Sequence, residues 1–201
     1  MAFRHLLAAA LLFTPASALA QDAAAPAVAP ALAAQTYRFA GTEWGASSEA
    51  TRAALTTHGF TLEQTEDDGS MIFAGAVNDR PALVVALFLE NRLSKILISV
   101  PTSDETTLPV YREMRSILDG QYGAPEVEVE SYAYPFAEGK HVGYEAAAIR
   151  VGKARIGAMW QTKGEALGLR ISERLIVSAH YESPAWKQEV DRRVQRSKTG
   201  L

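Results

Sequence analysis

Apolar residues recur every three or four positions between residues 107 and 122, which is the spacing of a helix with one buried face. Pro109 lies near the first turn of this stretch, where proline is tolerated, and Gly123 follows the last turn. Pro125 then prevents the helix from continuing. The pattern therefore predicts an amphipathic helix over 107–122.

A shorter stretch, 47–59, has the boundary residues of a helix but a weaker apolar pattern. Ser47 is a good N-cap residue, and Gly59 suits the position after the last turn. Small residues recur along it and predict a stripe that packs closely on a sheet: Ala50, Ala53, Ala54 and Thr57. His58 is expected to end this helix, where a positive charge is favourable.

Four strands with hairpin signals between them are predicted after the first helix, over 60–66, 70–77, 81–89 and 93–100. Asp68-Gly69 is the strongest turn signal, and Asn78-Asp79 and Asn91-Arg92 are acceptable two-residue turns. A turn at Asn91-Arg92 places apolar residues opposite each other in three pairs: Leu87 with Ile96, Val85 with Ile98, and Leu83 with Val100.

Four further strands are predicted after the second helix, over 126–134, 142–151, 154–161 and 166–181. A turn at Lys163-Gly164 gives three apolar pairs: Trp160 with Leu167, Ala158 with Leu169, and Ile156 with Ile171. A turn at Gly152-Lys153 would add Ile149 to the same face. The pattern fails at Glu173, which predicts a bulge or a strand end there.

The predicted order is helix, four strands, helix, four strands, and it indicates an α+β fold with an antiparallel sheet of about eight strands and two helices. The two units, 37–101 and 104–183, have the element order of a tandem repeat. This order resembles the tandem units of the β-lactamase inhibitor proteins, which are also exported and of similar size. Those inhibitors carry cysteines in each unit and this chain has none, so the resemblance is one of architecture.

The first twenty residues have the three parts of a secretory signal peptide. Arg4 supplies a positive charge, 6–13 is an apolar run, and Ala18-Leu19-Ala20 is an A-x-A cleavage pattern. The alternative, a membrane anchor, needs about 20 apolar residues. We therefore expect export to the periplasm, with an Ala/Pro-rich spacer over 21–35, one domain over 36–186 and a basic tail over 187–201.

The composition and the net charge of the chain argue against several classes of function. With no cysteine, the chain can form neither a disulfide scaffold nor a thiolate site. The net charge is −3, from 20 basic and 23 acidic residues, and this argues against non-specific binding to nucleic acid. The apolar run at the N-terminus is too short to span a bilayer, so no transmembrane segment is expected.

No catalytic or cofactor motif occurs in the sequence. His58, His141 and His180 lack the spacing of a metal site, and no nucleophile-elbow, Walker or dinucleotide-binding loop is present. Ser183 lies near His180 and Glu182, but Ser-Pro at this position favours a helix cap over a catalytic triad. We therefore predict no catalytic residue, metal or cofactor, and a protein that is not an enzyme.

Acidic residues alternate with valines in the predicted strand 126–134, where Glu126, Glu128 and Glu130 share one face. They would bind a cation or a basic partner, or they would keep an edge strand soluble and unpaired. Tyr132, Tyr134 and Phe136 continue this segment, either as a contact site or as part of the core.

One face of the second half of the predicted sheet has small residues surrounded by arginines. Gly157, Gly168 and Met159 are expected there, with four arginines around them: Arg150, Arg155, Arg170 and Arg174. Arginine suits the recognition of carboxylate or phosphate groups, although a sheet face exposed only to solvent fits the same pattern.

In the first half of the predicted sheet, both faces are apolar. The face with Phe73 and Phe88 must be covered by another part of the chain, by a second copy in a homodimer, or by a partner.

The leading hypothesis from the sequence is a non-enzymatic binding module that holds a protein or peptide on its sheet. The predicted site comprises Arg150, Arg155, Met159, Arg170, Arg174, Phe73 and Phe88. The alternatives are a binder of small ligands or anions that uses the arginine-lined face, and an enzyme of a type that no motif identifies.

Overall fold

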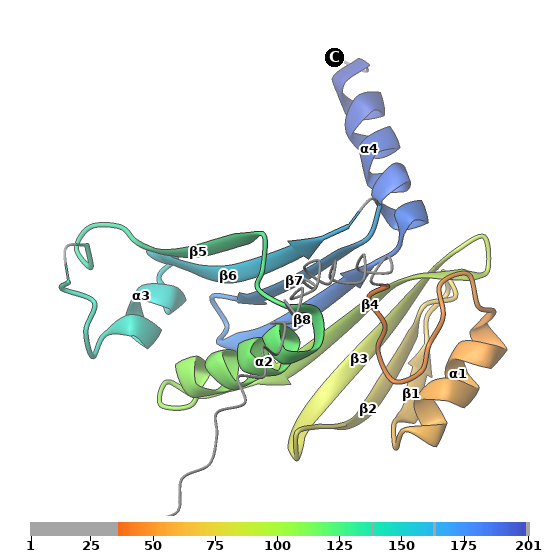
Figure 1. Ribbon diagram of the computed structural model, residues 1–201, viewed down its shortest axis with the longest axis horizontal. Coiled ribbons are helices and arrows are strands. Elements are labelled where there is room, and N and C mark those ends of the chain that lie inside the picture. Colours follow the sequence, from red (N-terminus) through yellow and green to blue (C-terminus); the bar gives the residue numbers. More distant parts are fainter. Residues whose placement is uncertain (1–35, 138, 163, 200–201) are drawn as a thin grey trace, which may run out of the picture. The chain divides into compact units, whose positions relative to one another are not determined.

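The computed structural model describes residues 36–137, 139–162 and 164–199. The expected signal peptide (1–20) and spacer (21–35) lie outside the described residues. The elements follow in the order α1 (Ser48–Thr57), β1 (Thr61–Thr65), β2 (Met71–Val77), β3 (Arg80–Leu89), β4 (Arg92–Pro101), α2 (Thr107–Tyr122), β5 (Val127–Tyr132), α3 (Glu145–Arg150), β6 (Ala154–Gln161), β7 (Ala166–Ile171), β8 (Ile176–Glu182) and α4 (Pro184–Thr199) (Figure 1).

All eight of these strands form one antiparallel sheet in the order β1-β2-β3-β4-β8-β7-β6-β5. The α+β class, the antiparallel sheet and the number of strands are confirmed, and four helices occur in the described residues where two were expected. The last strand of each half, β4 and β8, meet at the centre, and the strands run outward from this pair in the same order in the two halves. A duplicated origin of the halves stays a prediction.

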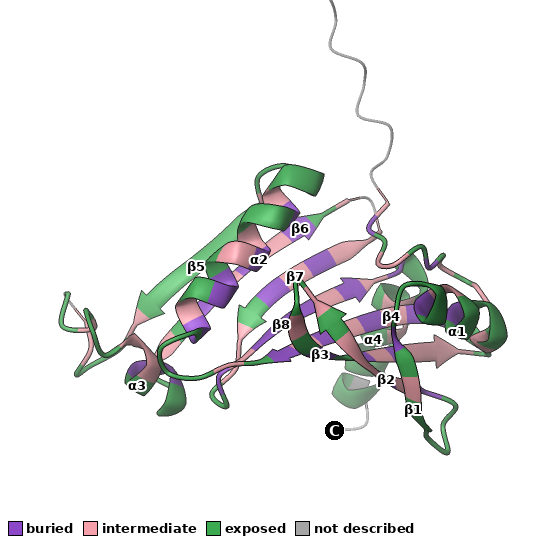
Figure 2. Ribbon diagram, turned by 90° about the horizontal axis from the view of Figure 1, so that it is seen from below, coloured by how far each residue is buried: buried purple, intermediate pink, exposed green. Residues whose placement is uncertain are grey.

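The helices cover the two faces of the sheet to different extents. Viewed from below, α1 and α2 lie in front of the strands and α4 lies behind them (Figure 2). The side chains beneath α1 and α2 form the core, including Leu55, Phe73, Ile96, Leu167 and Val177, each exposed by less than 2%. We call this side the covered face. No helix in the described part of the chain is both long and apolar enough to cross a membrane.

Helix α1 begins and ends as its sequence predicts, but a different stripe packs on the sheet. The Ser47 hydroxyl accepts a hydrogen bond from the Ala50 backbone N–H (3.2 Å), and Gly59 follows with φ +84°. The buried side chains are Thr51 and Leu55, one helical turn apart, whereas Ala50, Ala53 and Thr57 are exposed. The larger leucine buries more apolar area than any alanine, and this orients the helix.

The predicted register of the β3–β4 hairpin is wrong by one residue. The turn is Glu90-Asn91, both at positive φ, and not Asn91-Arg92. A bulge then shifts the ladder, so that Val84 pairs with Ile98. Because side chains alternate between faces, a slip of one residue exchanges the two faces of the strand. Leu83 is therefore 45% exposed, and Val84 is buried in the core.

Two other predicted hairpins are confirmed. Val77 pairs with Arg80 across the turn Asn78-Asp79, whose residues both have positive φ. In the second half, Trp160 pairs with Leu167 and Ala158 pairs with Leu169, as expected. The pattern failed at Glu173 because β7 and β8 are separate strands joined by a turn there.

The predicted strand 142–151 is wrong, because residues 145–150 form the helix α3. Three consecutive alanines follow Glu145, and alanine is the strongest helix former. Within this helix Ala148 and Ile149 are buried, and the helix packs against β6. The strand that pairs with the other side of β6 is β5, which precedes α3 in the chain.

Candidate functional site

The face of the sheet opposite α1 and α2 has a continuous row of paired residues across all eight strands. In order from β1 to β5 these are Gln64, Ile72, Val85, Leu97, His180, Gly168, Met159 and Val127. A second row runs beside it: Thr61, Ala74, Leu83, Ser99, Ser178, Arg170, Gly157 and Val129. We call the side formed by these two rows the open face.

The open face keeps apolar side chains in contact with solvent. Leu83 is 45% exposed, and Val127 and Val129 are each 41% exposed. Residues that lie under the helices on the covered face, such as Phe73 and Leu169, are at most 1% exposed. The difference follows from the helices, because α1 and α2 both lie on the covered face.

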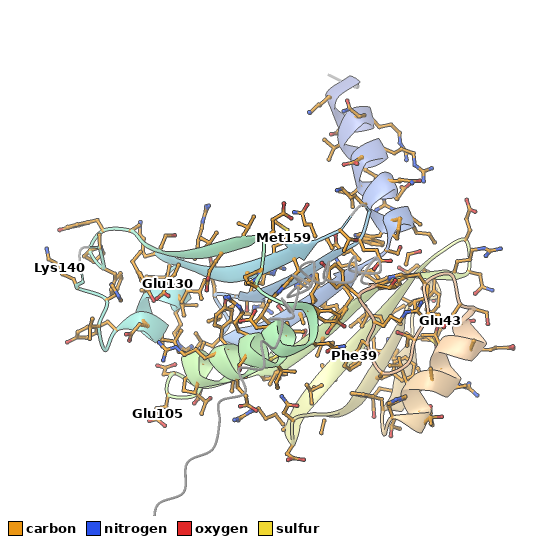
Figure 3. The ribbon with its side chains drawn as sticks, viewed as in Figure 1. Phe39, Glu43, Glu105, Glu130, Lys140 and Met159 are labelled. Carbon is orange, nitrogen blue, oxygen red and sulfur yellow. The ribbon has the colours of Figure 1, made fainter. Side chains whose placement is uncertain are left out.

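A groove with a volume of about 300 Å³ lies at the β5 end of the open face. Val127, Val129 and Met159 supply its apolar side chains, while Gly157 and Gly168 form a floor without side chains. At Gly168, a Cβ atom would meet nothing within 4 Å, so the hollow above this residue is open. Figure 3 shows Met159 on the side of the sheet opposite Glu130.

His180 stands at one wall of this groove, next to Gly168 in the row. Burial, together with the nearby charges of Arg170 and Lys95, lowers its pKa to about 4. The ring is therefore neutral at pH 7, and Nε2 lies 3.4 Å from the Ser178 hydroxyl. A neutral imidazole can donate or accept a hydrogen bond without a charge that repels apolar groups.

The base of α4 borders the open face beside the groove. Lys95 pairs with Glu182 at 2.7 Å, and its ammonium lies 5.0 Å from the centre of the Trp186 ring. Beyond this contact, Val190 and Val194 on α4 are exposed. The helix projects away from the sheet, as Figure 1 shows, and leaves the groove uncovered.

Only part of the predicted arginine site is assembled. Arg155 and Arg170 lie on the open face with Met159, on the neighbouring strands β6 and β7. Arg150 ends α3 and pairs with Asp104, and Arg174 lies in the turn between β7 and β8. The prediction of four arginines around one floor is therefore wrong. It placed Arg150 on a strand where α3 occurs, and it placed Arg174 inside a continuous strand 166–181 that the structure divides into β7 and β8.

The predicted apolar contact site in the first half is part of the core. Phe73 is 0% exposed and Phe88 packs against the core cluster. The one-residue slip of the β3–β4 register explains the error, since it turned these side chains to the wrong face. The chain itself covers Phe73 completely and Phe88 in part, so the two do not form the exposed contact site that was predicted.

A second, polar cleft of about 340 Å³ lies between α2 and β5 on the covered side. Arg115 makes ion pairs there with Asp119 (2.9 Å) and Glu128. The Glu130 carboxylate accepts a hydrogen bond from the Tyr132 hydroxyl (3.1 Å). Tyr111 also lines this cleft and is 6% exposed, and its hydroxyl has no hydrogen-bond partner among the described residues. Burial raises the pKa of Tyr111, so the phenol stays protonated.

The residues weighed for catalysis have structural roles. The Ser183 hydroxyl accepts a hydrogen bond from the Trp186 backbone N–H (3.2 Å) and so caps α4, as expected. His141 stacks on Tyr132 with ring centres 3.9 Å apart. Within the described residues, no three His, Asp or Glu side chains come together to hold a metal ion.

Several groove residues were missing from the sequence prediction. Val127, His180 and Glu182 come from two strands, β5 and β8, and only the order of the strands brings them beside Gly168. The regular alternation of Glu and Val in β5 is the sequence signal for the groove, because it places the valines together on the face opposite the glutamates. No protein-family model, curated protein or solved structure matches this chain.

Proposed function

We propose that the protein is an exported, non-enzymatic binding module that holds a protein or peptide partner on the open face of its sheet. The observation that carries the proposal is the uncovered apolar surface across the sheet, with the groove at its β5 end. Solvent-exposed apolar patches of this kind commonly mark interaction sites. We infer export from the expected signal peptide, and we propose the periplasm as the location.

The shape of the site favours a chain-like partner over a compact small ligand. The groove is a shallow hollow in a continuous sheet surface, and its floor consists of backbone at Gly157 and Gly168. Small-molecule sites are usually deeper and bury most of the ligand. Because Arg150 and Arg174 lie elsewhere, the anion-binding alternative retains only Arg155 and Arg170.

Selection from a random linear peptide library displayed on phage, with the protein as bait, tests this function. Peptides that bind the wild-type protein should lose binding to Gly168→Leu, which fills the groove without a clash at Cβ. Val142→Glu is the control, because Val142 is 71% exposed and lies outside the groove. The proposal fails if no peptide is enriched, or if enriched peptides bind Gly168→Leu as well as the wild type.

A further inference from the structure

Among the described residues, no strand pairs with the outer side of β5, which is an edge of the sheet. Its inner side pairs with β6, and the strand order ends at β5. The Ala133 N–H donates a hydrogen bond to the Lys153 carbonyl (2.7 Å), and this bond continues the register of the β5–β6 ladder. The odd-numbered residues of β5 therefore direct their backbone groups toward β6. Since the two sides of an antiparallel strand alternate, Glu128 and Glu130 direct their backbone groups to the free edge. These groups are available to pair with another strand.

Cavities border this edge on both faces of the sheet. The odd-numbered residues Val127 and Val129 line the apolar groove on the open face. The even-numbered residues Glu128 and Glu130 line the polar cleft on the covered side. A strand added beside β5 would therefore direct alternate side chains toward two different environments.

The charges in and around the polar cleft determine which kind of strand can pair with β5. Two arginines and three carboxylates line the cleft, and Arg115 is already paired with Asp119 and Glu128. Glu130 accepts a hydrogen bond from the Tyr132 hydroxyl and forms no ion pair within the described residues, and Glu126 extends the acidic row just before β5.

The same charges oppose a homodimer through this edge. A second copy that paired β5 with β5 around a two-fold axis would place the two acidic rows side by side. Like charges on directly opposite strands are destabilising. An incoming basic strand instead meets carboxylates of opposite charge.

From this arrangement we propose that the partner binds as an extended segment beside β5, adding a ninth strand to the sheet. Its alternate residues are apolar, toward Val127, Val129 and Met159, and basic, toward Glu128 and Glu130. The inference rests on the proposed function and specifies the chemistry of its partner. Main-chain hydrogen bonds supply affinity, and the alternating side chains supply selectivity.

The test uses a synthetic peptide in which lysine and valine alternate, titrated against the full chain by calorimetry. Two versions carry N-methyl groups on alternate residues, one set on the lysines and one on the valines. Only one set can point its N–H groups at β5, so one version should lose binding and the other should keep it. A peptide with glutamate in place of each lysine should bind at least about tenfold more weakly, because attraction becomes repulsion.

Variants of the protein locate the binding edge. Glu130→Lys should weaken binding of the lysine peptide by about tenfold and should strengthen binding of the glutamate peptide. Glu63→Lys is the matched control, since Glu63 is an exposed acid on the opposite edge strand, β1. Its binding should equal that of the wild type.

Three results would overturn strand addition: no binding of the lysine–valine peptide, equal binding of both N-methylated versions, or equal effects of Glu130→Lys and Glu63→Lys. In each case the outcome of the phage selection on Gly168→Leu decides separately whether the open face binds peptides. Failure of the strand model is therefore distinct from failure of the proposed function.

Discussion

The two faces of this sheet carry apolar residues in the same strands, and yet only one face is a core. On the covered face, Phe73, Leu167 and Val177 lie under helices and are inaccessible to solvent. On the open face, Leu83, Val127 and Val129 stay accessible, and Gly157 and Gly168 add no side chain. Apolar content alone therefore does not define a core: the position of the helices does.

If the covered face carries the stability, its largest side chain should matter most. Trp160 is 2% exposed, and its Nε1 donates to the Gly123 carbonyl (2.7 Å). Trp160→Ala should reduce the free energy of unfolding by about 3–5 kcal/mol in urea denaturation. Met159→Ala, on the open face of the same strand, should cost less than about 1 kcal/mol. Equal losses from the two variants would abolish the distinction between the faces.

Two glycines allow the same comparison with one added methyl group. At Gly75 on the covered face, a Cβ would lie 2.4 Å from the Phe60 ring, so Gly75→Ala should destabilise by about 1–3 kcal/mol. At Gly168 the space is open, and Gly168→Ala should be neutral or stabilising by up to about 1 kcal/mol. Thermal unfolding of both variants measures this difference in stability. A large loss of stability in Gly168→Ala would contradict it.

His180 gives the open face a pH dependence. Its pKa is about 4 in the folded protein and 6.5 as the reference value, so the unfolded chain binds more protons between these limits. Stability should therefore fall as the pH drops from about 6.5 toward 4, by roughly 1–2 kcal/mol after allowance for solvent screening. His180→Asn should reduce this fall in urea denaturation. An unchanged pH profile in the variant would show that His180 titrates normally.

The smallest effect is expected where the open face meets solvent. Arg155→Glu replaces an exposed side chain on β6 and should change the free energy of unfolding by less than about 0.5 kcal/mol. Chemical denaturation against the wild type checks this value. A loss above about 1 kcal/mol would place Arg155 in a structural interaction that its exposure does not indicate.

Most strands could be predicted from the sequence because local signals specify them. The number of strands agrees because two errors cancel: the predicted strand 142–151 is the helix α3, and the predicted strand 166–181 is the two strands β7 and β8. Asn78-Asp79 defines its turn, and the Trp160–Leu167 pair defines the β6–β7 register. The β3–β4 register could not be predicted in the same way, because both faces of these strands are apolar. Alternation then favours neither register, and the choice depends on a bulge and on a turn at Glu90-Asn91.

The candidate site was predictable only in part. Arg155, Arg170 and Met159 were assigned to one face because the β6–β7 hairpin is local in sequence. Val127, His180 and Glu182 join them only because β5 pairs with β6 and β8 pairs with β7. Arg150 was misplaced because a run of alanines between a tyrosine and an isoleucine fits a strand or a helix by periodicity alone.

The central claim is that the open face and the adjoining β5 edge bind an extended partner, while the buried side chains under α1 and α2 form the core. The most direct measurement is the change in backbone amide NMR shifts of the full chain when a selected peptide is added. We predict shifts concentrated at Val129, Gly157, Met159 and Gly168, with little change in α1. Shifts concentrated in α1 and on the outer surface of α2, with an undisturbed groove, would contradict the account.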